Sequence, residues 1–430
     1  MNPLLSRLQP YPFERLRLLH ADVTPNPAYK PISLGIGEPR HATPQLIKDA
    51  LAGSLAGLAN YPGTLGEPLL RQTISDWLAR RYGELQVDMA TQILPVNGSR
   101  EALFSLAQTV IDSGKLGVTR PADRPPLGGT APSGGSEPHE VGSVGATVVC
   151  PNPFYQIYEG AALLAGAQPW FAPSDAARNF AVDWAGVPDA VWANTQLLFV
   201  CSPGNPTGAV MGLAEWDMLF RLSDRYGFVI ASDECYSEIY FTGEPPLGGL
   251  QAASKLGRSD FKNLISLTSL SKRSNVPGLR SGFVAGDAAI IKSFLLYRTY
   301  HGSAMSPIVQ AASIAAWRDE QHVIENRALY QEKFARVTPM LAEVMDVALP
   351  DAGFYLWAAI PDVFGGSDTA FSRELLALYN VVVLPGSYLA RDAQGGNPGA
   401  GRIRMALVAE TAECVEAAGR IVQFVHSKAH

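Results

Sequence analysis

Short, continuous runs of apolar residues recur along the chain and alternate with longer amphipathic stretches. Five such runs, each bounded by turn residues or polar stretches, stand at residues 93–96, 146–150, 196–200, 227–232 and 263–268. Stretches such as 99–112 and 213–226 have the apolar spacing of helices. Apolar strands that alternate with helices are typical of a mainly parallel sheet covered on both faces. We therefore predict an α/β protein with a doubly wound, three-layer αβα core.

The pattern changes near residue 287, where the chain becomes more helical. The later apolar runs AGFYLWAAI, VVVLPG and RIRMALV predict a smaller α+β unit with a few strands of its own. A length of 430 residues also exceeds what one hydrophobic core usually organises. We predict an N-terminal segment at 1–50 that joins the small domain, a large domain at 51–290 and a small C-terminal domain at 291–430.

The stretch at 116–145 interrupts this organisation, because it is dense in Gly, Pro and Ser and lacks periodicity. Such a composition buries too little apolar surface to offset the entropy of ordering the chain. We predict an exposed, mobile insertion in the large domain and favour this interpretation over a functional lid.

Charge and composition exclude several classes of protein. A net charge of −6 without any Lys/Arg run provides no field that would attract a phosphate backbone, so nucleic acid is not an expected partner. The first residues place Pro and charges where a signal peptide needs an apolar stretch, and no later run is long enough to span a membrane. We expect a cytoplasmic protein that does not bind membranes.

Cysteine and histidine spacing argues against metal and disulfide sites. The 4 cysteines lack CxxC spacing, and the 7 histidines are dispersed without a ligand cluster. We predict reduced thiols and no bound metal.

The loops that follow the predicted strands carry the candidate chemistry, because ligands of doubly wound sheets bind at the carboxyl ends of strands. Gly98, Ser99 and Arg100 follow the first run and open a helix, where free backbone N–H groups offer an anion site. An ordinary Ser N-cap would explain this loop equally well. Asn205 stands in the turn CSPGNPTG after the third run, and Asx-Pro turns are common in loops.

Two further loops carry ionisable groups. Asp233 and Tyr236 follow the fourth run, and a carboxylate so close to a buried strand needs a cationic or hydrogen-bonding partner. A protein arginine would satisfy Asp233, and so would the protonated ring nitrogen of a cofactor. Lys272 follows the fifth run among small polar residues, which makes it a candidate for a lowered pKa and amine chemistry, although most lysines are solvated.

Four strand ends together supply an amine, a carboxylate with a phenol, an amide and phosphate donors. The phosphate donors are Ser99, Ser269 and Arg280. This set meets the needs of pyridoxal phosphate, which requires a lysine for a Schiff base, an acid for the pyridine nitrogen and donors for its phosphate. We therefore predict that Lys272 carries pyridoxal phosphate.

These motifs resemble those of the fold type I, class I and II aminotransferases, from LGIGEP near residue 34 to RIRMALV near residue 402. The resemblance implies the pyridoxal-phosphate-dependent transferase fold and makes Lys272 both cofactor carrier and general base. In the family pattern an arginine follows the lysine, and here Arg280 stands eight residues after it. The implied cofactor contacts are Gly98, Ser99, Arg100, Asn205, Asp233, Tyr236, Ser269 and Arg280.

The resemblance also implies an aromatic side chain that stacks on the cofactor and groups that bind the substrate. Tyr155, in a P-x-Y-x-x-Y pattern, matches the stacking residue, with Phe154 as the alternative. Arg404 matches the arginine that pairs with the substrate α-carboxylate, and Arg402, two residues earlier, is a candidate for a surface salt bridge. Gly37 matches the glycine that approaches the substrate.

A shared active site is a further implication of the resemblance. Tyr61, in NYPGTLGEPLLR, matches a tyrosine that reaches the phosphate of a neighbouring subunit, which implies a homodimer. Asn205 is expected to contact the substrate as well as the cofactor.

Within the family the chain is most similar to bacterial succinyldiaminopimelate transaminases, in motifs such as PVNGSREALF, SDECYSEIYF and VLPGSYLAR. This similarity implies ping-pong transfer of an amino group between N-succinyl-LL-2,6-diaminopimelate and 2-oxoglutarate, in diaminopimelate and lysine synthesis. Arg100 and Arg298 are candidates for binding the distal carboxylates, and each is also interpretable as a plain surface or dimer-contact arginine.

Three alternatives stay open at this point. Another class I or II aminotransferase, for alanine, aspartate or aromatic amino acids, would share these motifs. A pyridoxal-phosphate β-lyase would share every cofactor residue. An aminotransferase-like ligand sensor is the most distant alternative, because it requires a DNA-binding module before LGIGEP.

Overall fold

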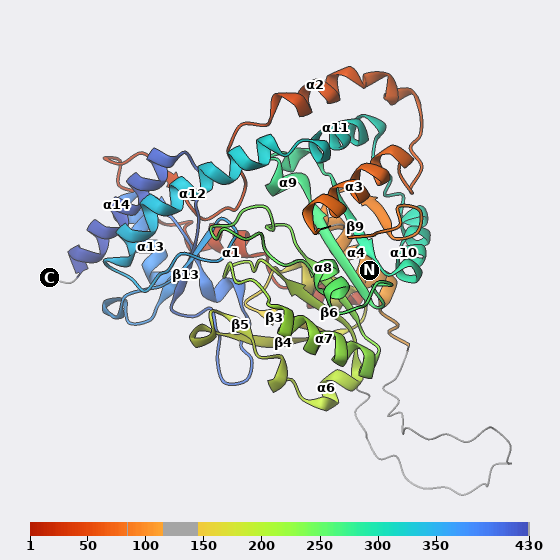
Figure 1. Ribbon diagram of the computed structural model, residues 1–430. Coiled ribbons are helices and arrows are strands. Elements are labelled where there is room, and N and C mark those ends of the chain that lie inside the picture. The colour runs from red at the N-terminus through yellow and green to blue at the C-terminus, as the bar shows by residue number, and fades with distance from the viewer. Residues whose placement is uncertain (84, 115–144, 429–430) are drawn as a thin grey trace, which may run out of the picture.

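The structure is a computed structural model of the chain and describes residues 1–83, 85–114 and 145–428. An eight-stranded sheet forms its centre (Figure 1). In spatial order the strands are β2 (Ile93–Val96), β9 (Gly282–Gly286), β8 (Leu264–Ser269), β7 (Val229–Asp233), β6 (Thr195–Cys201), β3 (Thr147–Asn152), β4 (Gln168–Asp175) and β5 (Ala181–Val182). The five strands predicted from apolar runs are β2, β3, β6, β7 and β8, so this prediction is confirmed.

The direction of β9 decides which loops meet. Strands β8, β7, β6, β3 and β4 are parallel, whereas β9 is antiparallel to both β8 and β2, and β5 is antiparallel to β4. Gly282, the first residue of β9, pairs with Ser269 at the end of β8 and with Val96 at the end of β2. Arg280, which precedes β9, therefore lies at the same edge of the sheet as the loops after β2 and β8.

Helices cover both faces of this sheet, as a three-layer αβα fold requires. Consecutive residues of β6 show the alternation: Leu198 packs in the apolar cluster on one face and Phe199 in the cluster on the other. The first cluster includes residues of α2 (Gln45–Gly53), α3 (Pro68–Arg81), α6 (Asp189–Asn194), α7 (Leu213–Tyr226), α8 (Gly249–Lys255) and α11 (Pro307–Arg318). The second includes residues of α4 (Ser99–Val110), α5 (Ile157–Leu164) and α10 (Ala288–His301).

The C-terminal part has its own sheet and apolar cluster. Strands β10 (Tyr355–Ala359), β13 (Arg402–Ala406) and β12 (Leu384–Pro385) form an antiparallel sheet in that order. Helices α12 (Gln321–Ala342), α13 (Asp368–Tyr379) and α14 (Thr411–Lys428) pack with it, and Figure 1 shows them beside the large sheet.

The N-terminal segment attaches to this C-terminal part. Strand β1 (Ile32–Ser33) pairs in parallel with β11 (Val381–Val382), and α1 (Pro12–Leu19) contacts η7 (Gly386–Leu389). The remaining short helices are α9 (Leu270–Arg273), η1 (Pro3–Arg7), η2 (Leu55–Ala59), η3 (Ala176–Arg178), η4 (Trp184–Gly186), η5 (Pro277–Leu279) and η6 (Asp362–Phe364). The domain boundaries at residues 50 and 290 stay predictions.

The predicted insertion at 116–145 lies, except for its last residue, outside the described residues. Among the described helices, none combines the length and the apolar character needed to cross a membrane.

Candidate active site

A pocket of about 460 Å³ opens at the edge of the sheet where β6, β7 and β8 end. Its walls come from the N-terminal segment, from the loops after these strands and from the C-terminal sheet. The sequence-predicted residues that line it are Gly37, Ser99, Arg100, Tyr155, Asn205, Asp233, Tyr236, Lys272, Arg280 and Arg404. The fold thus brings most of the candidate residues into one cavity.

Lys272 enters the pocket from α9, a single helical turn that begins directly after β8. Burial lowers the pKa of its ammonium group, Asp233 and Cys235 oppose this effect, and the charges of Arg280 and Arg100 add to it. A lysine amine with a lowered pKa is more often deprotonated, and only the neutral amine is a nucleophile.

Asp233, the last residue of β7, is buried with an exposed fraction of 4%. The Tyr158 hydroxyl donates a hydrogen bond to its Oδ2 (2.8 Å), and the Cys235 backbone N–H donates to its Oδ1 (3.3 Å). Burial raises the pKa of Asp233, and these hydrogen bonds and Lys272 lower it in part. Within the described part of the chain no arginine forms an ion pair with Asp233, so the carboxylate is free to face a cationic ring nitrogen.

Arg404, on β13, is buried beside the aromatic wall of the pocket. Its Nη1 donates to Asn205 Oδ1 (3.0 Å), its Nη2 donates to the Gly35 carbonyl (3.0 Å), and its guanidinium carbon lies 4.2 Å from the ring centre of Tyr355. Its Nε is buried and has no hydrogen-bond partner among the described residues. A buried guanidinium without a carboxylate is an anion receptor that the chain itself leaves unneutralised.

The loop after β2 and the residue before β9 form a cradle of donors. Gly98 has φ 86°, and a Cβ atom there would clash with the Arg280 guanidinium, so only glycine fits. Ser99 opens the 12-residue helix α4 with its free N–H groups, and Arg280 donates to the Pro277 carbonyl (2.9 Å). A helix N-terminus beside a guanidinium suits a phosphate group.

Besides Gly98, two predicted residues do not line the pocket. Ser269 is buried and caps α9: its oxygen accepts from the Ser271 N–H (3.1 Å), and its hydroxyl donates to the Ser281 carbonyl (3.1 Å). Ser271 lines the pocket in its place. Tyr61 is fully exposed and does not line this pocket, as expected for a residue that serves a neighbouring subunit.

The sequence left open whether Tyr155 or Phe154 stacks on the cofactor, and the two residues have different environments in the structure. Tyr155 lines the pocket, and Arg100 Nε donates to its hydroxyl oxygen (2.6 Å). Phe154 is buried against Phe171, with ring centres 4.9 Å apart. Only Tyr155 is therefore available for stacking on a ligand.

The environments of Arg298 and Arg402 differ from those expected from the sequence. Arg298 is completely buried, pairs with Glu101 (2.5 Å) and donates to the Ser303 carbonyl (2.7 Å), so it neither lines the pocket nor lies on the surface. Arg402 packs its guanidinium over the ring of Phe180 at 4.9 Å, and within the described residues it forms no salt bridge.

Sequence reasoning missed two tyrosines. Tyr158, whose hydroxyl donates to Asp233, is the second tyrosine of the P-x-Y-x-x-Y pattern. Its position one turn after Tyr155 was a usable signal that it faces the same site. Tyr355 of β10 shares a hydrogen bond with Tyr236 (3.0 Å between hydroxyl oxygens) and stands against Gly37, where any Cβ would clash with it. It comes from a distant strand, and no local motif marks it.

The whole donor set fits pyridoxal phosphate. Lys272, the unpaired Asp233, the Gly98 cradle and the ring of Tyr155 supply the amine, acid, phosphate donors and stacking surface that the cofactor requires. The sequence matches the family described as aminotransferase class I and II over residues 29–118 and 143–421. The chain belongs to this family. It is therefore a pyridoxal-phosphate-dependent aminotransferase, and the break in the match falls inside the predicted insertion at 116–145.

Individual relatives agree with this assignment. A crystal structure of an aminotransferase from Neisseria meningitidis is 54% identical, covers 99% of this chain and 100% of its own, and has a TM-score of 0.89. An LL-diaminopimelate aminotransferase of Desulforudis audaxviator is 30% identical over 421 residues, which is 97% of this chain and 96% of that protein. A probable N-succinyldiaminopimelate aminotransferase from Thermus thermophilus has a TM-score of 0.78 over 96% of this chain and 99% of its own, but at 24% identity it supports the fold alone.

Proposed function

We propose that this aminotransferase acts on N-succinyl-LL-2,6-diaminopimelate with 2-oxoglutarate as the acceptor, in the synthesis of diaminopimelate and lysine. The observation that carries this proposal is the set of arginines in the pocket. Arg100, Arg280 and Arg404 all line it, and in the described residues none of the three forms an ion pair. One of them suits the cofactor phosphate, which leaves one for the α-carboxylate of the substrate and one for a distal carboxylate.

The residues at the centre of the pocket divide the work of amino transfer. Bound pyridoxal phosphate supplies an aldehyde that combines with amines and a ring that withdraws electrons from the substrate α-carbon. Lys272 holds the cofactor and, once its amine is free, moves the proton at the α-carbon. Asp233 keeps the ring nitrogen protonated, and Tyr236 with Asn205 donates to the ring oxygen. Ser99 and Arg280 bind the phosphate.

The substrate lies between two of the arginines in this proposal. Arg404 binds the α-carboxylate and so fixes the α-carbon near the Lys272 amine. Arg100 binds a distal carboxylate, because its guanidinium is held between the rings of Tyr11 and Tyr155 at 6.0 and 5.9 Å. Both the diaminopimelate derivative and 2-oxoglutarate carry such a second carboxylate, which suits the two halves of a ping-pong reaction.

Free LL-diaminopimelate is the second candidate substrate. Curated relatives named LL-diaminopimelate aminotransferase support it, and so does Glu38, which lines the pocket together with Arg100. A free distal ammonium group would pair with Glu38, whereas succinylation removes that positive charge. Glu38 is therefore the residue that separates the two substrates.

The test is a panel of amino donors with 2-oxoglutarate as acceptor and glutamate formation as the readout. The donors are N-succinyl-LL-diaminopimelate, LL-diaminopimelate, alanine, aspartate and tyrosine. We expect the succinylated donor to have the highest kcat/KM. If free LL-diaminopimelate exceeds it, the second candidate is correct, and if both are no better than the simple amino acids, the diaminopimelate proposal fails.

Two variants show whether the distal site works as proposed. Arg100→Met should raise KM for N-succinyl-LL-diaminopimelate and for 2-oxoglutarate by about tenfold or more, the loss expected for one charge-assisted pair, and leave KM for alanine almost unaffected. Glu38→Gln should raise KM for free LL-diaminopimelate only. Pyruvate and ammonia released from a cysteine-like substrate would instead favour a β-lyase.

We also propose a homodimer that shares its active sites through Tyr61. This tyrosine and the neighbouring Leu55 and Leu58 are exposed, and so are Leu296 and Tyr300 of α10. Pairing with a second copy of the chain would remove these apolar side chains from water. Sedimentation analysis of the holoenzyme should give twice the mass of the 46.1 kDa chain.

A further inference from the structure

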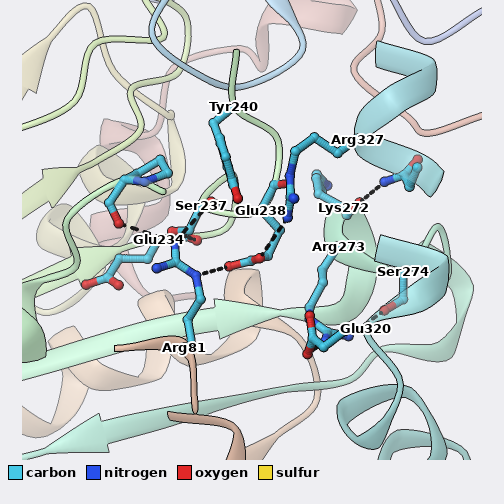
Figure 2. Close-up of polar contacts among 12 residues, drawn as sticks. Arg81, Glu234, Ser237, Glu238, Tyr240, Lys272, Arg273, Ser274, Glu320 and Arg327 are labelled. Carbon is cyan, nitrogen blue, oxygen red and sulfur yellow. Dashed lines mark hydrogen bonds and ion pairs between the residues drawn. The ribbon is translucent and has the colours of Figure 1, made fainter. Parts of the chain in front are cut away.

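The first turns of α12 pack against the single helical turn that carries Lys272. Asn326 of α12 is buried with an exposed fraction of 3%, and its Nδ2 donates a hydrogen bond to the Lys272 backbone carbonyl (3.2 Å). On either side, Arg273 pairs with Glu320 (2.5 Å), and Arg327 donates to the Glu238 carbonyl (2.9 Å). Figure 2 shows Lys272 and Arg273 beside Glu320 and Arg327.

The Lys272 carbonyl needs an outside partner because α9 is so short. The last carbonyls of any helix lack an intrahelical donor, and in a four-residue turn this applies to Lys272 itself. Asn326 supplies that donor. The Asn326 side chain is in turn fixed at its oxygen, which accepts from Asn275 Nδ2 (2.9 Å) and from His41 Nδ1 (2.7 Å).

The donors in this chain of contacts run in one direction. Lys333 Nζ lies 2.5 Å from His41 Nε2, and because an ammonium group only donates, Nε2 must accept. A neutral imidazole that accepts at Nε2 carries its hydrogen on Nδ1, so His41 donates to Asn326 Oδ1. The Asn326 amide is thereby oriented with its NH₂ group toward the Lys272 carbonyl.

We propose that Lys333, His41 and Asn326 form a relay of hydrogen bonds that positions Lys272 for reaction. The inference rests on the proposed role of Lys272 as the lysine that holds the cofactor. All three are positioning residues: none of them lines the pocket, and they act on Lys272 through its backbone.

Two features of the surroundings fit the relay. Burial lowers the pKa of His41 and the Lys333 charge adds to this effect, whereas the hydrogen bond to Asn326 and the Glu410 charge raise it in part; the net lowering favours the neutral imidazole that the donor direction requires. His41 also packs against the Tyr330 ring at 4.6 Å and lies four residues after Gly37. The relay therefore connects the N-terminal wall of the pocket to the reactive lysine.

Asn326→Asp and His41→Phe break the relay at different points. The aspartate keeps an oxygen for His41 and Asn275 but places a second oxygen against the Lys272 carbonyl, and phenylalanine keeps the ring that packs on Tyr330. His322→Gln is the matched control, because His322 stands one turn earlier on α12 and binds the Ser274 side chain (2.8 Å) instead of Lys272. His41→Phe alone leaves the Lys333 ammonium group buried without its acceptor. The double variant with Lys333→Met removes that ammonium group as well.

The main readout does not use the loaded enzyme. In cofactor-free protein, the rate of acetylation of the Lys272 amine is measured against pH by peptide mass spectrometry. A backbone that is no longer held admits water to the amine, so its titration should shift upward by about one pH unit, a tenfold change in deprotonated fraction. In the holoenzyme, we expect both relay variants to lower kcat by about tenfold or more with KM changed less than threefold.

The outcomes separate the relay from a structural role and from the cofactor assignment. The proposal holds if both relay variants and the double variant shift the Lys272 titration, while His322→Gln, at a comparable loss of thermal stability, does not. An equal shift in His322→Gln, or none in the relay variants, overturns it. Borohydride reduction of the wild-type holoenzyme should tag Lys272: a tag elsewhere overturns the proposed function together with the relay, whereas a tag on Lys272 with unshifted variants overturns the relay alone.

Discussion

The charge of Asp233 depends in part on the hydroxyl group of Tyr158. Buried carboxylates favour the neutral form, and burial accordingly raises the pKa of Asp233. The Tyr158 hydroxyl works against this effect, because it donates to the carboxylate at 2.8 Å and thus favours the charged form. Tyr158 is itself held in place by stacking on Phe199, with ring centres 4.6 Å apart.

We predict that Tyr158→Phe moves the acidic limb of the kcat/KM profile to higher pH. Without the hydroxyl the charged form of Asp233 is less stabilised, so the pKa of Asp233 rises further. Activity that requires the carboxylate is then lost at a higher pH as the pH falls. A hydrogen bond to a charged group contributes about 1.5–3 kcal/mol, which corresponds to a shift of about one to two pH units. Phe199→Leu is the control, because it weakens packing but keeps the hydroxyl. An unmoved limb in Tyr158→Phe would show that Tyr158 does not set the charge of Asp233.

Single side chains also mark where sequence reasoning reached its limit. The rule that ligands lie at strand ends identified loops that line the pocket, but it does not tell which residue of a turn points inward. Ser269 caps α9, whereas Ser271, two residues later, faces the pocket. Arg298 was a candidate for a distal carboxylate, and its pairing with Glu101 depends on the packing of α10 against α4, which no local pattern reveals.

At the scale of elements, the loop after β7 is fixed by contacts on the side away from the pocket as well as by contacts in the pocket. Glu234 is buried and accepts hydrogen bonds from Tyr82 (3.1 Å), Ser232 (2.8 Å) and the Gly249 N–H (2.8 Å). Glu238 lies between Arg81 of α3 at 2.7 Å and Arg327 of α12 at 3.4 Å, as Figure 2 shows. These contacts fix the loop that carries Asp233 and Tyr236 to two helices.

We predict that Glu238→Gln destabilises the protein by about 3 kcal/mol, because it leaves two arginines with little access to water and without a countercharge. The side chains of Arg81 and Glu238 are only 8% and 5% exposed. Glu332→Gln is the control, since its pair with Arg336 is about half exposed and should contribute less than about 0.5 kcal/mol. Urea unfolding of the two variants under identical conditions measures the difference. Equal unfolding midpoints would mean that the buried pair adds nothing.

Elements differed in how well the sequence predicted them. The central strands β3, β6, β7 and β8 are buried on both faces and consist largely of apolar residues, so they were predictable. Strand β4 was missed because its sequence QPWFAPSD contains two prolines, and β9 was missed because GFVAG is short and begins and ends with glycine. Their place in the sheet is decided by pairing with β3 and with β2 and β8, which is long-range information.

At the scale of the whole molecule, the pocket is complete only where three distant parts of the chain meet. Gly37 comes from the N-terminal segment, Lys272 from the large sheet, and Tyr355 and Arg404 from the C-terminal sheet. The pairing of β1 with β11 explains why the N-terminal segment lies beside the C-terminal sheet. Tyr61 is fully exposed and does not line this pocket, and we proposed above that it serves the site of a second copy of the chain.

If Tyr61 serves the site of its partner, two inactive variants should restore each other. Lys272→Ala lacks the amine, and Tyr61→Ala should lack phosphate binding when the cofactor is limiting. In a mixed dimer, one site receives Lys272 from one subunit and Tyr61 from the other and is therefore intact. Co-expression of the two variants should give about a quarter of wild-type activity, because random pairing makes half of the dimers mixed, each with one intact site.

The control pairs Lys272→Ala with Asp233→Asn. Both residues line the same pocket of one chain, so every site in a mixed dimer lacks one of them and activity should stay at the sum of the separate variants. Restoration by Tyr61→Ala but not by Asp233→Asn would assign Tyr61 to the neighbouring site by function. If neither pair restores activity while sedimentation confirms dimers, Tyr61 is an ordinary surface residue with no role in the neighbouring site.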